Sequence, residues 1–364
     1  MKKHYGLFVL CLLCLWGCQP TQPIGLATNQ LPISTAKFTL DGWQVDTVYR
    51  GADYKGYLTH FVNESVGYQV CTNYPEILKT VDGGHSWETQ KSPLVVGRTS
   101  PTSIDFLDEQ TGFITFQRSG GGPDRYSTVP SLIRTRDGGK TWTLIEATIN
   151  GTLSDAHFLT VDEGVATLLE LFTINQVPNS RRSVVRTTDG GASWQPVSDI
   201  AIAMSLNAVY YVNRQVGFIR GTNRQLYRTL DGGRNWQLTE GPLPNGWETQ
   251  PVIFYDADLG YTNASDGFYR TIDGGKSWQL LWTGATDVMG FVNRKEQLFI
   301  RTTKVYNHGD YSDVERELRQ TTDGGQTFRS YPPVFNLRHP YVRFVSDRVG
   351  YGTYANKLFR FSRK

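Results

Sequence analysis

Six aspartates that recur along the chain are its clearest candidates for chemistry. Each is followed by two glycines and belongs to a nine-residue stretch, here called a box, of the form Arg/Lys-Thr-x-Asp-Gly-Gly-x-x-Trp, with Gln320 and Phe328 as the two departures at the ends of the last box. The aspartates are Asp82, Asp137, Asp189, Asp231, Asp273 and Asp323. Gathered on one face, they would form a ring of carboxylates that could act as an active site. Paired carboxylates at a defined separation can, for example, hydrolyse glycosidic bonds.

A turn-forming role is the alternative for the same residues. Asp-Gly-Gly between two alternating apolar runs is typical of a β-hairpin. Glycine tolerates positive φ, and an aspartate side chain accepts hydrogen bonds from the amides that follow it. We expect the aromatic residue that ends each box to be buried, and we predict that the boxes are structural rather than catalytic. These aromatic residues are Trp87, Trp142, Trp194, Trp236, Trp278 and Phe328.

The spacing of the boxes indicates repeated supersecondary units. Successive box aspartates lie 42 to 55 residues apart, a period typical of repeat architectures. A second phrase occurs seven times and predicts two strands joined by a polar turn, as in Phe61-Val62-Asn63 to Gly67-Tyr68. A third strand leads into each box and a fourth follows it. Four antiparallel strands per repeat predict the blade of a β-propeller.

The two ends of the chain set the number of blades. The seventh unit stops after its third strand, Leu358 to Phe361, whereas Trp43 to Tyr49 resembles a fourth strand that lacks the three before it. We expect these two segments to pair, which would close the ring and hide exposed strand edges. The predicted fold class is all-β: residues 38–364 form a seven-bladed β-propeller of four-stranded antiparallel blades, with the last blade closed by the N-terminal strand.

The first 37 residues predict export and a tether. Residues 1–17 combine a basic start with an apolar run too short to span a bilayer, which is typical of a signal peptide. The run ends in Leu15-Trp16-Gly17-Cys18, which resembles a bacterial lipobox and implies that Cys18 is lipidated; an ordinary secreted protein is the alternative. Residues 18–37 predict a tether. We expect a protein of the cell envelope, lipid-anchored at the outer membrane and facing the periplasm.

Charge and cysteine content argue against several classes of protein. The net charge is only +3 over 364 residues, which does not favour nucleic-acid binding. Two of the four cysteines lie in the predicted signal peptide and Cys18 is the predicted lipid site. Cys71 is then the only cysteine of the predicted propeller, and we expect a buried thiol rather than a disulfide framework.

The segment from His308 to Glu315 is the richest cluster of candidate metal ligands in the sequence. It has no glycine and no glutamate at the positions where a calcium loop needs them, and it lacks the ligand spacing of a zinc site. Gly120-Gly121-Gly122 lacks the Lys-Ser/Thr that completes a phosphate-binding loop. We therefore predict no metal site and no cofactor, and we interpret His308 to Glu315 as a solvated acidic loop.

The blade pattern predicts two unlike faces. Turns between strands 1 and 2 and between strands 3 and 4 share a face, so all boxes lie together. Long connections lie on the other face, including Arg118 to Pro130, Thr173 to Arg182 and Lys304 to Arg316. Long loops on a rigid scaffold commonly carry binding residues, and Tyr, Trp and Arg are frequent anchors. The candidates are Arg118, Arg125, Tyr126, Arg181, Arg182, Trp247, His308, Tyr311 and Arg338, with ordinary solvated loop positions as the alternative for each.

The boxes resemble the Asp-box of sialidases, sortilin-type receptors, xyloglucanases and photosystem II assembly factors, where it is a structural turn. From Phe38 onward the chain resembles the photosystem II stability/assembly factor family of single seven-bladed propellers. That resemblance rests on the boxes, the Phe-x-Asp/Asn…Gly-Phe/Tyr strand pairs and the closing N-terminal strand. It implies a non-enzymatic scaffold that binds a protein partner through the loop-bearing face.

A carbohydrate-binding or glycoside-hydrolysing propeller is the alternative function. Sialidases also need an early Arg-Ile-Pro motif, which this sequence lacks, together with an Arg triad and a Tyr nucleophile. Xyloglucanase-type enzymes place their cleft between two propellers, whereas this chain has the length of one. We therefore expect no catalytic residue. As a structural residue, Trp236 should cost roughly 3–5 kcal/mol of stability when replaced by Ala.

Overall fold

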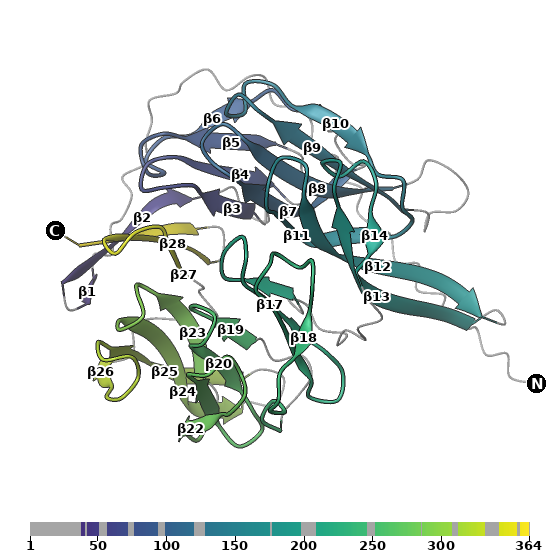
Figure 1. Cartoon of the computed structure of the whole chain (residues 1–364). Coiled ribbons are helices and arrows are strands. Elements are labelled where there is room, and N and C mark those ends of the chain that lie inside the picture. The colour runs from purple at the N-terminus through teal and green to yellow at the C-terminus, as the bar shows by residue number, and fades with distance from the viewer. Residues whose placement is uncertain are drawn as a thin grey trace, which may run out of the picture. The chain divides into compact units, whose positions relative to one another are not determined.

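Each sequence repeat forms one four-stranded antiparallel sheet in the computed structural model, and the sheets follow one another around a ring (Figure 1). The described residues are 38–40, 42–50, 57–71, 76–93, 99–119, 128–174, 177–197, 209–245, 252–284, 286–307, 312–331, 342–354 and 357–363. They contain no helix long and apolar enough to cross a membrane. The predicted signal peptide and tether lie outside them, so those assignments stay predictions.

Blades 1 to 3 are built from consecutive strands. Blade 1 contains β3 (Tyr57–Phe61), β4 (Gly67–Cys71), β5 (Ile77–Thr80) and β6 (Glu88–Gln90). Blade 2 contains β7 (Thr99–Phe106), β8 (Gly112–Ser119), β9 (Thr128–Thr135) and β10 (Thr143–Glu146). Blade 3 contains β11 (Thr152–Phe158), β12 (Gly164–Ile174), β13 (Val177–Thr187) and β14 (Gln195–Pro196).

Blades 4 to 6 repeat the same order. Blade 4 contains β15 (Val209–Tyr211), β16 (Gly217–Arg220), β17 (Leu226–Thr229) and β18 (Gln237–Leu238). Blade 5 contains β19 (Val252–Phe254), β20 (Gly260–Asn263), β21 (Phe268–Thr271) and β22 (Gln279–Trp282). Blade 6 contains β23 (Thr286–Phe291), β24 (Gln297–Asn307), β25 (Ser312–Thr321) and β26 (Arg329–Tyr331).

Blade 7 joins the two ends of the described chain. It contains β27 (Val342–Phe344), β28 (Val349–Tyr354), β29 (Lys357–Ser362), β2 (Trp43–Arg50) and β1 (Phe38–Leu40). The predicted closure is confirmed, because β2 pairs with β29 in a register that sets Val45 opposite Phe361. Figure 1 shows the yellow end of the chain beside purple β2. The sequence did not predict β1, which adds a fifth strand outside β2.

Stacked aromatic rings join most blades to the next. The aromatic residue that ends the first strand of blade 2, Phe106, stacks on Tyr68 of blade 1 with ring centroids 3.8 Å apart. The same ring meets the box tryptophan of its own blade, Trp142, edge-on at 6.2 Å. The ring also covers Gly112, where a Cβ atom would lie 2.2 Å from Phe106. This contact gives a physical reason for the glycine that begins most second strands.

The blade-closing strand is held by a buried carboxylate. Glu296, in the turn between β23 and β24, accepts hydrogen bonds from Trp43 Nε1 at 3.0 Å and from Gln320 Nε2 at 2.9 Å. Its second oxygen accepts a hydrogen bond from the Arg363 guanidinium at 2.6 Å. Arg363 also lies over the Trp43 ring, 4.7 Å from its centroid. The N-terminal strand, the C-terminus and blade 6 therefore meet at one side chain.

Two of the three connections that the sequence predicts as loops, Thr173 to Arg182 and Lys304 to Arg316, are largely strand, and strands also cover both ends of the third. β8 and β9 extend over both ends of Arg118 to Pro130, and β24 and β25 extend over most of Lys304 to Arg316. In blade 3, β12 and β13 stay paired out to Ile174 and Val177, so Thr173 to Arg182 is a β-ribbon and not a loop. For these two connections the loop prediction was wrong, because β-branched residues on both sides, such as Ile174 and Val177 or Val305 and Val314, continue the ladder.

Box tryptophans differ in burial, and this revises the cost expected for their loss. Trp194 is 3% exposed, whereas Trp236 is only partly buried and its Nε1 has no hydrogen bond. We expect Trp194→Ala to lower the free energy of unfolding by roughly 3–5 kcal/mol and Trp236→Ala by about 1–3 kcal/mol. Denaturant unfolding followed by far-UV circular dichroism measures both. Equal losses at the two sites would contradict this ranking.

The Glu296 contacts give a second stability prediction. Glu296→Ala leaves the Trp43, Gln320 and Arg363 donors without their acceptor, so we expect a loss of roughly 3–5 kcal/mol in the same assay. Glu240→Ala is the matched control, because that side chain is 79% exposed in its pair with Lys276. The control should change stability by less than about 0.5 kcal/mol. Similar losses in the two variants would show that Glu296 does not hold the closing strand.

Candidate functional site

The box carboxylates are occupied by hydrogen bonds from their own turns. Asp137 accepts from the backbone N–H of Thr141 at 2.9 Å, from its hydroxyl at 2.6 Å and from the Thr135 hydroxyl at 2.8 Å. The hydrogen bonds from Thr141, with that from Thr135, lower the pKa of Asp137 to about 2. The same pattern recurs in the other five boxes. These oxygens are therefore engaged in turn formation and are poorly placed to act on a ligand.

Each box is also tied to the turn between the first two strands of its blade. The N–H of Gly138 donates to the Gln110 carbonyl at 2.9 Å, and the other five boxes repeat this bond. Blade 7 has no box, and there the Arg363 N–H donates to the Arg348 carbonyl at 3.0 Å instead. The boxes and these turns therefore lie on the same face, here called the box face.

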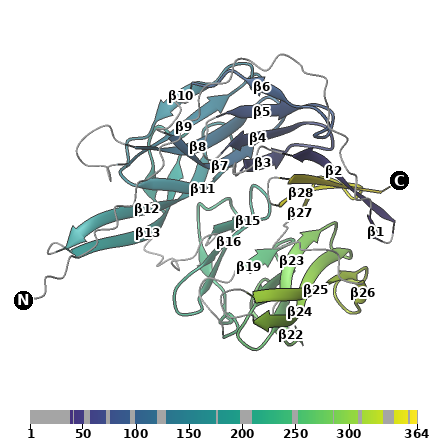
Figure 2. The same ribbon diagram turned by 180° about the vertical axis from the view of Figure 1, so that it is seen from behind.

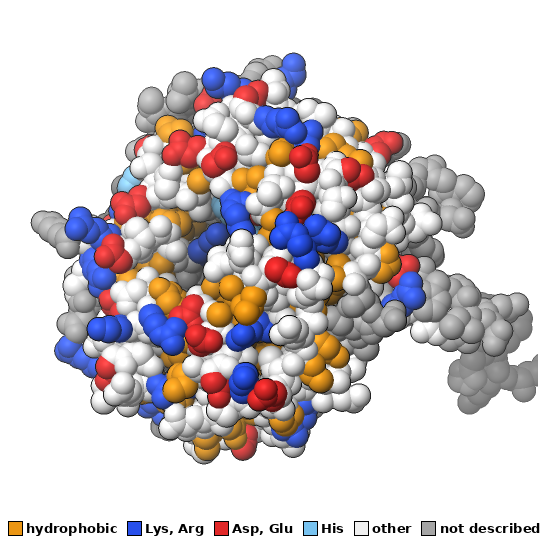
Figure 3. Space-filling view, viewed as in Figure 1, with side chains coloured by type: hydrophobic (Ala, Val, Ile, Leu, Met, Phe, Trp, Pro, Cys, Tyr) orange, Lys and Arg blue, Asp and Glu red, His pale blue; other side chains and the backbone are white. Residues whose placement is uncertain are grey.

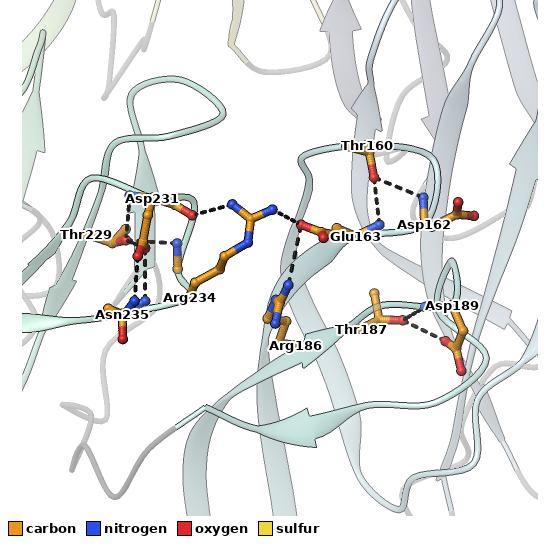
Figure 4. A network of polar contacts seen from close by, with 11 residues as sticks. Thr160, Asp162, Glu163, Arg186, Thr187, Asp189, Thr229, Asp231, Arg234 and Asn235 are labelled. Carbon is orange, nitrogen blue, oxygen red and sulfur yellow. Dashed lines mark hydrogen bonds and ion pairs between the residues drawn. The ribbon is translucent and has the colours of Figure 1, made fainter.

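Basic residues on the box face bridge neighbouring blades. Lys79 of blade 1 donates to the Gly138 carbonyl of blade 2 at 2.7 Å, and Arg270 of blade 5 donates to the Gly324 carbonyl of blade 6 at 2.7 Å. In Figure 4, Glu163 lies between Arg186 of blade 3 and Arg234 in the box of blade 4 and pairs with both. Much of the basic charge on this face is thus used within the ring.

The one box that begins with Gln rather than Arg or Lys precedes the blade that lacks a box. Gln320 has no following box carbonyl to reach, and its amide instead donates to Glu296 and accepts from the Tyr331 hydroxyl at 2.8 Å. The other departure, Phe328, packs edge-on against Trp282 with centroids 4.7 Å apart. Trp282 fills space beside the smaller ring. Both departures from the repeat therefore have a local structural cause.

Four polar residues form an arc at the inner strands of blades 7, 1, 2 and 3. Arg343, His60, Asp105 and His157 each precede the aromatic residue that ends the first strand of their blade. Arg343 donates to His60 Nδ1 at 3.3 Å. Asp105 lies 4.0 Å from His60 Nδ1 and 3.5 Å from His157 Nδ1. We call these four residues the axial cluster.

Burial keeps the two imidazoles of the axial cluster neutral near pH 7. Burial and then the Arg343 guanidinium lower the pKa of His60 to about 3, against the opposing effect of Asp105. Burial likewise lowers the pKa of His157. The Asp105 carboxylate also accepts the Phe158 N–H at 2.7 Å. The cluster therefore combines one buried carboxylate, two neutral imidazoles and the exposed Arg343 guanidinium.

Arg214 extends across the box-face end of the inner strands. Its guanidinium donates to the Phe158 carbonyl of blade 3 at 3.0 Å and to the Leu107 carbonyl of blade 2 at 2.6 Å, although Arg214 itself belongs to blade 4. Figure 3 shows one face of the molecule, with charged side chains of both signs around a hollow near its middle. The axial cluster could offer hydrogen bonds and charge to a ligand from the centre of the ring.

The chemistry available to the cluster is limited by its neighbours. No Ser, Thr or Cys side chain in the described part of the chain forms a hydrogen bond with His60 or His157. Over the same residues there is no group of three or more His, Cys, Asp or Glu placed to share a metal ion. Among the described residues, the contacts of the two imidazoles are with charged and aromatic side chains.

Most of the binding residues predicted from sequence lie outside the described part of the chain. Arg125, Tyr126, Trp247, His308, Tyr311 and Arg338 lie outside the described residues, as does Cys18. The backbone of Arg118 lies in β8, opposite Thr99 and Val129. Arg181 and Arg182 lie in β13, where Arg181 pairs with Glu170 at 2.7 Å. The structure therefore places Arg118, Arg181 and Arg182 in the paired strands of two ribbons.

Sequence analysis did not identify the axial cluster, although a signal for it is present. Aligning the seven strand-turn-strand phrases by their first aromatic residue puts Arg343, His60, Asp105 and His157 in one column. The other three positions of the column are Tyr210, Ile253 and Gly290, so four of the seven residues at this level of the inner strands are charged or histidine. The column gives a weaker signal than the long connections, because insertions on a rigid scaffold commonly carry binding residues.

No family model and no curated protein matches this chain. Among solved structures, it is similar to YCF48 bound to a D1 peptide, with a TM-score of 0.58 and 16% sequence identity over 92% of this chain and 100% of that one. It is also similar to YCF48 from Cyanidioschyzon merolae, with a TM-score of 0.57 and 14% identity over 88% and 98% of the two chains. At these identities the similarity shows a shared fold.

The axial cluster gives a prediction for acid stability. Folded His60 stays neutral down to about pH 3, whereas an unfolded histidine takes up a proton near its ordinary pKa of 6.5. Between these values the unfolded chain binds more protons, so stability should fall as the pH is lowered from 6.5 toward 3. His60→Asn should flatten this dependence, as measured by denaturant unfolding at a series of pH values.

His85→Asn, which removes an imidazole from an exposed box turn, controls for the loss of a histidine. The box aspartates act in a separate, lower window, because the stability they add is lost only below about pH 4. An unchanged slope between pH 6.5 and 4 in His60→Asn would show that the buried imidazole does not set the acid response.

Proposed function

We propose that this chain is a non-enzymatic propeller scaffold that binds a protein partner, in the manner of an assembly or stability factor. The observation that carries the proposal is the similarity of nearly the whole chain to YCF48, in a structure where that protein holds a D1 peptide. Propellers serve many functions, so the chemistry of this chain has to agree with the assignment independently.

The described side chains favour binding over catalysis. The box carboxylates are engaged within their turns, and the carboxylate of the axial cluster is buried between two neutral imidazoles. Much of the remaining charge bridges blades. The surface that remains available for binding a partner consists of the ribbons of blades 2, 3 and 6, on the face opposite the boxes, and the connections beside them. A rigid ring that displays such elements suits recognition of a polypeptide.

We propose further that this scaffold is held at a membrane through lipid on Cys18, followed by the tether of residues 18–37. The basis is the lipobox-like sequence ahead of Cys18. Several acyl chains on one residue give stable anchoring. Cys18→Ser should move the protein from the membrane fraction to the soluble fraction of the native host. Retention of the variant in the membrane fraction would contradict the anchor.

Affinity capture from native-host membranes tests partner binding. In the test variant, an Asn-Gly turn joins Gln117 to Pro130, Glu170 to Arg181 and Lys304 to Glu315, three pairs that already face each other across their ribbons. The control variant carries Val81→Ser and Ile272→Ser, two changes at exposed positions on the box face. We expect a specific protein to be captured by the wild type and the control but lost with the trimmed ribbons.

Two outcomes would overturn the proposal. Capture of the same protein by the trimmed variant would show that binding does not use the ribbon-bearing face. If no protein is captured and a glycan array binds the wild type instead, the carbohydrate alternative replaces the scaffold. Circular dichroism of the trimmed variant, compared with the wild type, confirms that the ring is intact before either result is interpreted.

A further inference from the structure

The ribbon of blade 3 extends well beyond the strands that flank it. β12 and β13 pair residue by residue from Gly164↔Thr187 to Ile174↔Val177 with no shift of register. β11 covers β12 only as far as Leu169, and β14 pairs with β13 only at Val185 and Arg186. Beyond Leu169, the described residues supply no third strand. Both views show this two-stranded ribbon projecting past the neighbouring blades (Figures 1 and 2).

Gly151 explains why β11 begins only at Thr152, opposite Leu169 of β12. Its φ of 127° lies in a region open mainly to glycine, and a Cβ atom at this position would lie 2.5 Å from the Leu169 carbonyl oxygen. The chain that leads into β11 therefore crosses close to β12 at Leu169 and does not continue along it. The edge of β12 from Glu170 to Ile174 has no partner strand within the described chain.

Unpaired strand edges invite pairing with another chain, and proteins commonly guard them with charges, bulges or proline. The blade 6 ribbon, β24 and β25, has such guards. Its register shifts between Thr302 and Lys304, and Glu317 at its base pairs with Arg301 and Arg319. The sequence of that ribbon also carries charged residues near its tip. Its edges are therefore poorly suited to adding a strand.

The blade 3 ribbon lacks most of these guards. Its register is unbroken, and residues 171–180 contain no charged side chain. The ion pair between Arg181 and Glu170 lies at its base. Pro178 removes one backbone donor from β13, so that edge is interrupted. β12 contains no proline and keeps every backbone donor and acceptor. Of the two edges, that of β12 is the better template for another strand.

We propose that the edge of β12 from Glu170 to Ile174 binds an extended segment of the partner polypeptide as an added β-strand, in line with β11. This inference rests on the proposed function, because it supplies the mode by which the scaffold holds a protein. In strand addition, backbone hydrogen bonds give affinity and alternate side chains give selectivity. Five residues of edge accommodate a strand about 17 Å long.

Peptides from a random library test the proposal without knowledge of the partner. Twelve-residue peptides displayed on phage would be selected against the full chain, and the tightest binder would be synthesised. In one variant Asn-Gly joins Glu170 to Arg181, which removes the proposed edge. In the matched control Asn-Gly joins Lys304 to Glu315 and trims the blade 6 ribbon by the same ten residues.

We expect the blade 3 variant to bind the peptide at least about tenfold more weakly and the blade 6 variant to bind it like the wild type. A backbone N-methyl scan of the peptide should weaken binding at every second position, because alternate N–H groups of an added strand face the edge. Hydrogen exchange should slow at those amides of residues 170–174 that point away from β13 when the peptide is bound.

Three results would overturn the proposal, and they differ in what else they affect. If the blade 3 variant still binds the peptide fully, the edge is not the docking site but the proposed function stands. If no peptide binds any form of the chain, the proposed function fails together with the docking site. If sedimentation shows a dimer that the blade 3 variant loses, the edge binds a second copy of the chain instead of a partner peptide.

Discussion

The pairing of β2 with β29 is the constraint on which the ring depends. Without β2, the last blade would present an unpaired third strand, and the Glu296 carboxylate would lose the Trp43 donor. A carboxylate that is 7% exposed is stable only if its hydrogen bonds are complete. Gln320 and Arg363 supply the rest, so blade 6, the N-terminal strand and the C-terminus stabilise one another.

Elsewhere in the ring, contacts made by the boxes and by the strand-turn-strand phrases join neighbouring blades. The box turn is rigid because its aspartate and threonine satisfy each other and the backbone around them. Rigid turns then present carbonyl oxygens to basic residues of the preceding blade, such as Lys79. Between the faces, stacked rings such as Phe113 and Phe158, whose centroids are 3.5 Å apart, form the blade-to-blade core. Neighbouring blades are therefore held together by polar contacts on the box face and by aromatic contacts in the core.

The fold could be predicted from the sequence because its determinants repeat. The spacing of the boxes predicts the length of the repeated blade. The incomplete units at Trp43 and Leu358 predict seven blades and the pairing that closes the ring. The fifth strand, β1, was missed because three residues carry too little pattern. The sequence predicts a loop in place of the blade 3 ribbon because the extra residues make this repeat longer than the others. The residues themselves nevertheless favour strand.

The candidate site was harder to predict, for physical reasons. The contacts of Arg343 with His60 and of Asp105 with His157 join residues from different blades, and no local pattern encodes which blades become neighbours until the ring is closed. The unpaired edge of β12 depends on the place where another segment, at Gly151, turns away. Whether a strand edge is unpaired depends on how the sheet is assembled, so no pattern of residues in β12 itself predicts it.

Closure between the two ends of the chain also imposes an order in time. β2 is synthesised before blades 1 to 6 but pairs with β29, which lies about 300 residues later. At about 5–20 residues per second, β2 waits on the order of tens of seconds for its partner. During that interval Trp43 and the apolar side of β2 stay exposed, whereas blades 1 to 6 can form as their own strands emerge. The ring can therefore be completed only after β29 has been synthesised.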